Sequence, residues 1–340
     1  MKRFSCSCGH PVFFENRVCT ACGAALGFDA ERLDMVALIA DPVSGWRGPD
    51  GKAYRNCRNQ LEHDTCNWLL DAGDNHDYCV SCRLNRTIPN LAKGENYAFW
   101  QRIEQAKRRL LYSLLWLGLP VLRQTRGWPQ GLLFDFIEAP GKPVVDKDTV
   151  MTGHKDGVIT LNVAEADDVF RAMQRKHMNE AYRTLLGHFR HESGHYYFYY
   201  LVDDDDKLQH CRRLFGDERV DYQAALDRYY QQGPLPDWES AYISAYSTAH
   251  PGEDWAESWA HYLHMLDCLE TAASYGLMDA LLWDDSLDGW LEEWPKFTVL
   301  LNELNRAMGL RDAYPFVISN TVADKLRFIH QLLRAAVHSS

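Results

Sequence analysis

The stretch that decides the fold is His191-Glu192-Ser193-Gly194-His195. On an α-helix, residues four apart lie one above the other, so His191 and His195 can bind the same metal ion. Glu192 lies between them and is suited to accept a proton from a water molecule that the ion activates. Residues 167–201 contain no proline, and apolar residues recur there at near-helical spacing. The pattern predicts a catalytic zinc site, and a chance match on a surface helix is the alternative.

A catalytic zinc ion needs a third protein ligand, and the best candidate lies in the segment His250-Pro-Gly-Glu253-Asp-Trp-Ala-Glu257. His250-Pro-Gly predicts a turn, and a helix is expected to begin near Glu253. Glu253 and Glu257 are four residues apart and therefore share a helix face. One carboxylate can bind zinc while the other holds a ligand histidine through its second ring nitrogen. We favour Glu253 as the ligand, with Glu257 as the orienting or alternative one. A solvated acidic first turn is the competing interpretation.

Four more histidines lie close to these motifs in the sequence. They are His188, His250, His261 and His264. We expect buried polar neighbours of the site rather than metal ligands at most of these positions, although His261 or His264 could replace a carboxylate and His250 could line a cleft.

The two motifs together resemble a known class of enzymes. His-Glu-x-x-His followed by Glu-x-x-Ala-Glu is similar to the gluzincin metallopeptidases, and the spacing is similar to that of the anthrax lethal factor peptidase domain. There, a tyrosine seven residues before the glutamate ligand lies over the zinc and stabilises the tetrahedral intermediate. Tyr246 precedes Glu253 by the same interval, so the resemblance assigns that role to Tyr246.

Nearly the whole chain resembles a bacterial family of zinc-binding metallopeptidases. In that family a zinc ribbon precedes a segment like His-Pro-x-Glu-Asp-Trp-Ala-Glu-x-Trp-Ala-His-Tyr-Leu-His. This chain carries His250-Pro-Gly-Glu-Asp-Trp-Ala-Glu-Ser-Trp-Ala-His-Tyr-Leu-His264. The resemblance implies a zinc-ribbon domain at residues 1–92 and a zincin-like peptidase domain at residues 93–340.

Eight of the ten cysteines lie within the first 82 residues and form two quartets, Cys6, Cys8, Cys19 and Cys22, then Cys57, Cys66, Cys79 and Cys82. Each quartet ends in Cys-x-x-Cys, a spacing typical of zinc ribbons. Disulfides are the alternative, but the N-terminus lacks the apolar core of a signal peptide. We therefore expect a cytoplasmic protein with two structural zinc ions beside the catalytic one. Cys211 and Cys268 are isolated, and we expect them to be small, partly buried hydrophobic residues.

Composition limits the classes of partner. Residues 1–92 hold 10 Lys and Arg against 11 Asp and Glu, and the whole chain has a net charge of −11. A nucleic-acid-binding ribbon normally carries a basic stripe, so this balance argues against nucleic acid. The longest apolar run, residues 110–122, contains a proline and is too short to span a membrane. We expect a peptide or protein substrate and allow for a protein partner at the ribbons.

The remaining pattern predicts an α+β fold with a small sheet and a large helical lobe. Residues 95–118 predict a helix and residues 132–137 a strand, whereas residues 150–154 and 158–163 flank the hairpin turn Lys155-Asp156-Gly157. Residues 158–163 are the best candidate for an edge strand that pairs with extended substrate. From residue 207 onward the chain is predicted to be mostly helical.

The function predicted from these observations is zinc-dependent hydrolysis of peptide bonds, with Glu192 as general base. A zinc hydrolase acting on a non-protein amide would use the same atoms. A binding module on a zincin scaffold, with weak catalysis or none, is the third interpretation, although such a module has no need of Glu192 or Tyr246.

Overall fold

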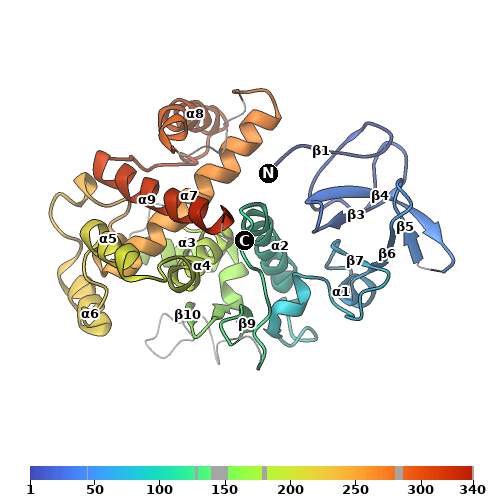
Figure 1. Ribbon diagram of the computed structural model, residues 1–340, viewed down its shortest axis with the longest axis horizontal. Helices are drawn as coiled ribbons and strands as arrows, with labels where there is room; N and C mark the ends of the chain where they lie inside the picture. The colour runs from blue at the N-terminus through green and yellow to red at the C-terminus, as the bar shows by residue number, and fades with distance from the viewer. Residues whose placement is uncertain (44, 127–128, 139–151, 178–181, 280–285, 339–340) are drawn as a thin grey trace. The chain divides into compact units, whose positions relative to one another are not determined.

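The computed structural model describes residues 1–340 except 44, 127–128, 139–151, 178–181, 280–285 and 339–340. The chain folds into two compact units, residues 1–171 and 172–340. All described strands belong to the first unit, and the second is built from helices (Figure 1). This mixed architecture, with small N-terminal sheets followed by a helical C-terminal part, confirms the predicted α+β fold class.

The first unit begins with two antiparallel sheets and one short helix. The elements are β1 (Phe4–Ser5), β2 (Pro11–Val12), β3 (Ala25–Asp29), β4 (Asp34–Asp41), β5 (Gly45–Arg47), β6 (Ala53–Asn56), α1 (Arg58–His63) and β7 (Leu69–Asp71). Strands β1 and β2 pair with each other, and β3 to β7 form a meander in chain order. The meander buries Val36, Leu38, Tyr54 and Leu69 as a small core. This core is small because the strands are short, so metal sites would have to supply much of the stability of this segment.

The rest of the first unit contains a long helix and a second sheet. Its elements are η1 (Cys82–Leu84), β8 (Asn85–Thr87), α2 (Asn96–Trp116), β9 (Leu133–Ile137), β10 (Gly153–Lys155), β11 (Val158–Asn162) and η2 (Val163–Ala166). Helix α3 (Asp168–His177) crosses the boundary between the two units.

Helix α2 packs against the N-terminal sheets through aromatic side chains. Tyr112 of α2 lies with its ring centroid 5.7 Å from that of Phe14 and 6.1 Å from that of Phe28. Phe28 in turn lies 4.9 Å from Trp68. These side chains are all buried, so α2 shares a core with the cysteine-rich segment. The compact unit consequently extends to residue 171 and includes residues beyond the composition change near residue 92.

The four-stranded sheet corrects one prediction from the sequence. Its order is β10-β11-β9-β8, so β11 lies between two neighbours. The predicted hairpin is confirmed: Lys155 pairs with Val158, and Asp156 and Gly157 both have positive φ angles of 50° and 79°. The prediction that residues 158–163 form a substrate-binding edge was wrong. Strand β10 pairs with one edge of β11, and β9 pairs in parallel with the other edge. Residues 150 and 151 of the predicted hairpin lie outside the described residues.

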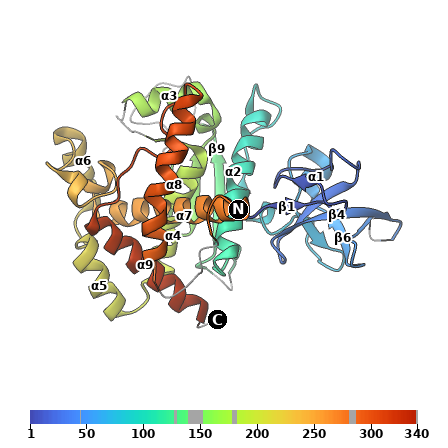
Figure 2. The same cartoon turned by 90° about the horizontal axis from the view of Figure 1, so that it is seen from above.

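The second unit consists of six α-helices and two 3₁₀ turns among the residues described. They are α4 (Leu185–Leu201), α5 (Asp205–Phe215), α6 (Tyr222–Gln232), η3 (Trp238–Ser240), η4 (Tyr246–Thr248), α7 (Pro251–Ser274), α8 (Asp288–Ala307) and α9 (Asn320–His338). Helices α4 and α7 lie against each other in both ribbon views (Figures 1 and 2). Helix α7 is also packed against α9, and α5 contacts both helices.

The helix that carries the His-Glu-x-x-His motif begins later than the absence of proline suggested. Thr184 has extended backbone angles, and its side chain accepts a hydrogen bond from the backbone N–H of Gly187 at 2.9 Å. This N-cap starts α4 separately from α3. Six residues of α4, 185–190, precede His191, so this first ligand candidate lies well inside the helix, away from the end that frays.

Candidate metal centre

Helices α4 and α7 bring three side chains of the predicted site together. Each of His191, His195 and Glu253 offers one ligand atom, and these atoms lie within 4.8 Å of one another. The Nε2 atom of His191 lies 3.0 Å from Oε2 of Glu253, and Nε2 of His195 lies 3.6 Å from Oε1. The histidines come from successive turns of α4, whereas Glu253 comes from the first turn of α7. Two nitrogens and one oxygen in this arrangement match the ligand set of a catalytic zinc site.

The start of α7 is fixed by a histidine cap. His250 precedes Pro251, and its Nδ1 atom accepts a hydrogen bond from the N–H of Gly252 at 2.9 Å. Its Nε2 atom donates to the carbonyl oxygen of Val220 at 3.0 Å. Both ring nitrogens are therefore used, so His250 orients the helix and does not add a ligand to the cluster. Proline at the first helical position requires no backbone N–H and helps to start the helix.

The two variable residues of the His-Glu-x-x-His motif hold the helices together. The indole N–H of Trp255 donates to the carbonyl oxygen of Gly194 at 2.9 Å, and that of Trp259 donates to Oγ of Ser193 at 3.0 Å. A Cβ atom on Gly194 would lie 2.9 Å from Cα of Ala256. The absence of a side chain at Gly194 thus lets α7 approach α4 closely enough to bring Glu253 to the histidines.

Glu257 contacts the far side of one ligand candidate. Its Oε1 atom lies 2.7 Å from Nδ1 of His191. A carboxylate at this position fixes the ring orientation and makes the other nitrogen a better electron-pair donor. The structure therefore brings Glu253 to the cluster and Glu257 to the outer nitrogen of His191.

The arrangement of donor atoms around His191 calls for a cation. When Nδ1 of His191 donates its proton to Glu257, the Nε2 atom carries a lone pair that faces a carboxylate oxygen of Glu253 at 3.0 Å. That oxygen is buried and has no hydrogen-bond partner among the described residues. Burial by itself lowers the pKa of His191, but Glu253 and Glu257 raise it well above its usual value. Either a proton or a metal ion must fill this position, and the donor set fits zinc.

Two further predicted residues lie near the cluster. Glu192 is buried on α4, and burial raises the pKa of its carboxyl group, an effect that the neighbouring histidines oppose. Tyr246 lies in η4, with its ring centroid 6.1 Å from that of His191. Burial raises the pKa of Tyr246 well above its ordinary value, so its hydroxyl keeps its proton and can donate it in a hydrogen bond.

Sequence reasoning missed one residue at this centre. The hydroxyl of Tyr222, at the start of α6, donates to Oε1 of Glu253 at 2.7 Å. No motif links a tyrosine to a glutamate 31 positions later, and a tyrosine at the start of a helix is not distinctive in a chain that contains 17 of them. Only the folded arrangement brings the two side chains together.

The other candidate histidines do not join the ligand cluster. Nδ1 of His261 lies 2.7 Å from the hydroxyl oxygen of Tyr314, and the His264 ring contacts the rings of Tyr314 and Trp294. Burial lowers the pKa of His261 to about 4. His188 is likewise outside the group of ligand atoms found among the described residues. These histidines are polar members of the protein interior.

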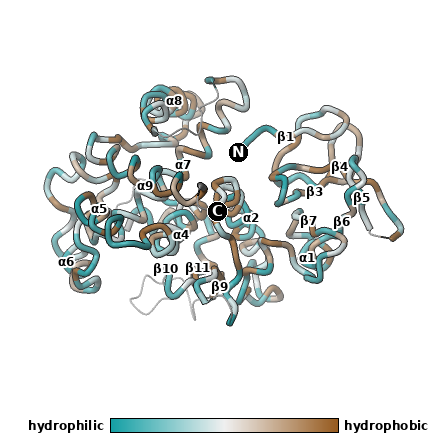
Figure 3. Tube along the Cα trace, viewed as in Figure 1, coloured by the Kyte–Doolittle hydropathy of each residue, from teal (hydrophilic) through white to brown (hydrophobic). Residues whose placement is uncertain are grey.

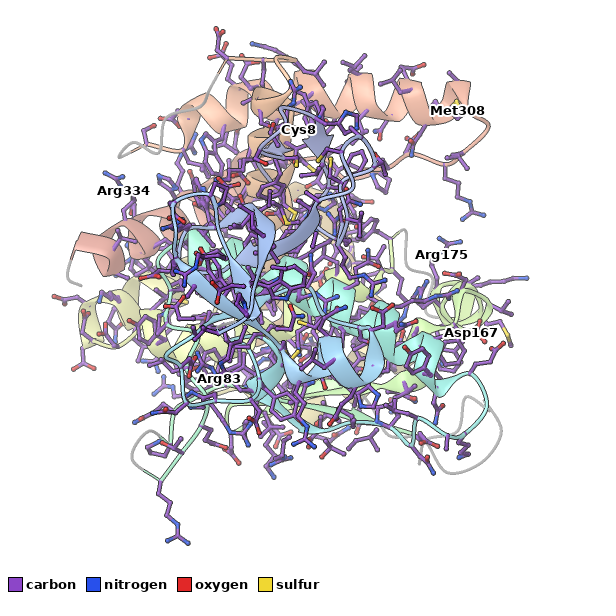
Figure 4. The ribbon with its side chains drawn as sticks, turned by 90° about the vertical axis from the view of Figure 1, so that its right-hand side faces the viewer. Cys8, Arg83, Asp167, Arg175, Met308 and Arg334 are labelled. Atoms are coloured by element: carbon purple, nitrogen blue, oxygen red, sulfur yellow. The ribbon has the colours of Figure 1, made fainter. Side chains whose placement is uncertain are left out.

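Both cysteine quartets assemble in the first unit. In the first, Sγ of Cys6 lies 3.7 Å from that of Cys22, and Sγ of Cys8 lies 3.8 Å from that of Cys19. Yellow sulfur atoms can be followed beside the Cys8 label in Figure 4. Zinc bound at about 2.3 Å in a regular tetrahedron would separate its sulfur ligands by about 3.8 Å. The quartet therefore has the dimensions of a tetrathiolate zinc site.

The second quartet is more deeply enclosed. All four side chains are buried, and Sγ of Cys66 lies 3.7 Å from that of Cys79. The backbone N–H of Trp68 donates to Sγ of Cys66 at 3.4 Å. The buried Arg108 of α2 lies near these thiols, which help to raise its pKa against the opposing effect of burial. A buried cation offsets part of the negative charge that four thiolates and one zinc ion would carry.

The last two cysteines are separate from these sites. Burial raises the pKa of Cys211 to about 12 and that of Cys268 to about 11. A thiol with such a pKa is a poor nucleophile at neutral pH. Cys211 is buried and Cys268 is partly buried, which fits the prediction of small, partly buried hydrophobic residues.

Comparison with known proteins places the chain in a family. A model described as "Putative zinc-binding metallo-peptidase" matches residues 96–332, and a zinc-ribbon domain model matches residues 3–93. The chain belongs to this zinc-binding metallopeptidase family. Its relatives include three uncharacterised mycobacterial proteins, one from Mycobacterium bovis and two from strains of Mycobacterium tuberculosis. Each is 41% identical over 342 residues, covering 98% of this chain and 95% of the relative. No solved structure matches the chain.

The family descriptions agree with the chemistry of the three clusters. Both the peptidase model and the ribbon model concern zinc, and the matched ranges contain the His191, His195 and Glu253 cluster and the two cysteine quartets respectively. Within the described residues, no helix is long and apolar enough to cross a bilayer. Hydrophilic segments interrupt the hydrophobic ones along the helices (Figure 3).

Proposed function

We propose that this protein is a zinc-dependent peptidase of the gluzincin type, with His191, His195 and Glu253 as the catalytic zinc ligands. The observation that carries the proposal is the group of two imidazole nitrogens and one buried carboxylate oxygen, with Glu192 next to it on α4. Zinc held there would act as a Lewis acid toward water and toward the substrate carbonyl group. The two cysteine quartets would bind one structural zinc ion each.

Three side chains of the protein then divide the proton transfers and charge stabilisation. Glu192 accepts a proton from the attacking water and later gives it to the leaving amine. Burial is the main cause that raises the pKa of Glu192, and a carboxylate with a raised pKa is a stronger base than an exposed one. Tyr246 donates a hydrogen bond to the oxygen atom on which negative charge develops. Glu257 keeps the His191 ring oriented through its Nδ1 atom.

Two other functions use part of this machinery. Hydrolysis of a non-protein amide would need the same ligands and the same base. A binding module would need neither Glu192 nor Tyr246. The presence of both residues beside the ligand cluster favours hydrolysis, and the family description favours peptides over other amides.

Metal analysis tests the ligand set. We expect about three zinc ions per purified chain, falling to about two in Glu253→Ala. In Glu257→Ala the count should stay at about three, because Glu257 contacts only the outer nitrogen of His191, although affinity should weaken by about 10–100-fold. A count of about two in the unaltered protein, unchanged by either substitution, would favour the binding module.

Glu192→Gln tests the base. Glutamine keeps the size of the side chain and one acceptor oxygen, but its amide cannot take up the proton. We expect the variant to keep its zinc and to lose turnover of fluorogenic peptides by about 10²–10⁴-fold. Normal turnover in Glu192→Gln would reject Glu192 as the base. Cleavage of small amides but of no peptide by the unaltered protein would favour the amide hydrolase.

A further inference from the structure

The third ligand candidate is held by a tyrosine from another helix. Both carboxylate oxygens of Glu253 have a close neighbour: Oε2 lies 3.0 Å from Nε2 of His191, and Oε1 accepts a hydrogen bond of 2.7 Å from the Tyr222 hydroxyl. Glu253 itself is only 1% exposed. Rotation of this carboxylate would break the bond to Tyr222, so Tyr222 fixes which oxygen faces His191.

Tyr222 is itself fixed relative to the first turn of α7. Asp221 caps α6 by accepting a hydrogen bond from the N–H of Ala224 at 2.7 Å. The ring of Tyr222 lies against that of His250, with 5.1 Å between the ring centroids. His250 also bonds to the carbonyl oxygen of Val220. One histidine thus joins the residues before α6 to the start of α7, which holds the tyrosine hydroxyl and Glu253 in a fixed relation.

We propose that Tyr222 is a positioning residue of the metal centre, which orients Glu253 for metal binding. This inference rests on the proposed function, since it assumes that Glu253 binds a metal ion. Partners that hydrogen-bond to metal ligands typically contribute about 10–100-fold to metal affinity or activity. The Tyr222 side chain is 46% exposed, so its ring contributes less to folding stability than a fully buried ring.

Tyr222→Phe removes only the hydroxyl and keeps the ring against His250. The experiment uses the full-length protein and measures zinc affinity by competition with a chromogenic chelator, together with kcat and KM for a peptide. We expect the zinc ion at the His191 cluster to bind about 10–100-fold more weakly, with no change at the cysteine quartets. We expect kcat to fall more than KM changes, since the orientation of a metal ligand acts on the reacting groups.

Tyr199→Phe is the matched control, because Tyr199 lies on α4 but is 76% exposed. Its zinc affinity and kinetics should equal those of the unaltered protein. Zinc affinity in Tyr222→Phe within about twofold of the unaltered value would overturn the inference, because partners of metal ligands normally contribute more than that. A lower melting temperature of zinc-free Tyr222→Phe, together with an unchanged zinc affinity, would show that Tyr222 contributes to folding stability instead. If the unaltered protein binds no zinc at the His191 cluster, the proposed function fails together with this inference.

Discussion

Two histidines of the second unit, His191 and His261, lie in opposite electrostatic surroundings. His191 lies between two carboxylates, which raise its pKa, whereas His261 is 7% exposed and lies beside Tyr314. Burial lowers the pKa of His261 from 6.5 to about 4, which outweighs the opposing effect of Glu257. An imidazole that is neutral in the folded protein therefore becomes protonated only when the chain unfolds or the pH becomes strongly acidic.

His261 should make the protein sensitive to acid. Between pH 6.5 and about 4 the unfolded chain binds a proton at this histidine and the folded chain does not, so the free energy of unfolding falls as the pH falls. The full effect of one such group over this range is about 3 kcal/mol. We expect His261→Gln to have a flatter dependence of unfolding free energy on pH, as measured by urea denaturation from pH 7 to pH 4. Parallel curves for the two proteins would show that His261 is not the responsible group, since all other acid-sensitive groups are common to both.

At the scale of helices and strands, the His191 cluster depends on how closely α4 and α7 approach each other. Gly194 allows contact with Ala256, while Trp255 and Trp259 donate hydrogen bonds across the same interface. Protein interiors are packed densely enough that one additional methyl group has to be accommodated by movement. Because Glu253 lies three residues before Ala256 on α7, any movement of the helix also moves a ligand candidate.

Gly194→Ala should therefore affect both stability and metal binding. The added Cβ would lie 2.9 Å from Cα of Ala256 and 3.0 Å from Cδ1 of Trp259. We expect the free energy of unfolding to fall by about 1–3 kcal/mol, measured by chemical denaturation, with weaker zinc binding at the His191 cluster. Gly289→Ala on α8 is the control, because its Cβ would meet nothing within 4 Å. That variant should be neutral or up to about 1 kcal/mol more stable, and equal behaviour of the two variants would contradict the packing argument.

At the scale of the whole molecule, the three groups of candidate metal ligands differ in their access to solvent. Cys8 and Cys22 of the first quartet are exposed, all four cysteines of the second quartet are buried, and the His191 cluster is intermediate. Buried Arg108 lies beside the second quartet only. Exposure lets a competing chelator reach a thiolate ligand, whereas burial requires local opening of the fold first.

Zinc release should consequently proceed in distinct phases. We expect a chromogenic chelator to remove zinc from the first quartet faster than from the second. In the Cys8→Ser variant the faster of these two phases should be absent from the release curve. Cys268→Ser should leave both phases unchanged, because Cys268 belongs to neither quartet. Loss of far-ultraviolet circular dichroism should accompany the slower phase, since that quartet shares its surroundings with α2. A slow phase that disappears in Cys8→Ser would contradict the assignment.

The sequence by itself determined what depends on local spacing. His191 and His195 are four positions apart, which places both side chains on one helix face, and Asp156-Gly157 has the positive φ angles that a tight hairpin needs. The cysteine spacings likewise indicated two quartets, and the helical content after residue 207 followed from the residue pattern. These features are fixed by backbone geometry over a few residues, so they could be predicted without knowledge of the fold.

Only the tertiary structure decided the features that join segments distant in sequence. The position of β11 inside its sheet, the contact of Tyr222 with Glu253 and the place of Arg108 beside the second quartet have no fixed spacing in the chain. Gly194 lies within the motif, yet its importance comes from Ala256 on another helix. Such contacts depend on how whole elements pack, because a side chain fits or clashes only against neighbours that the folded chain brings to it.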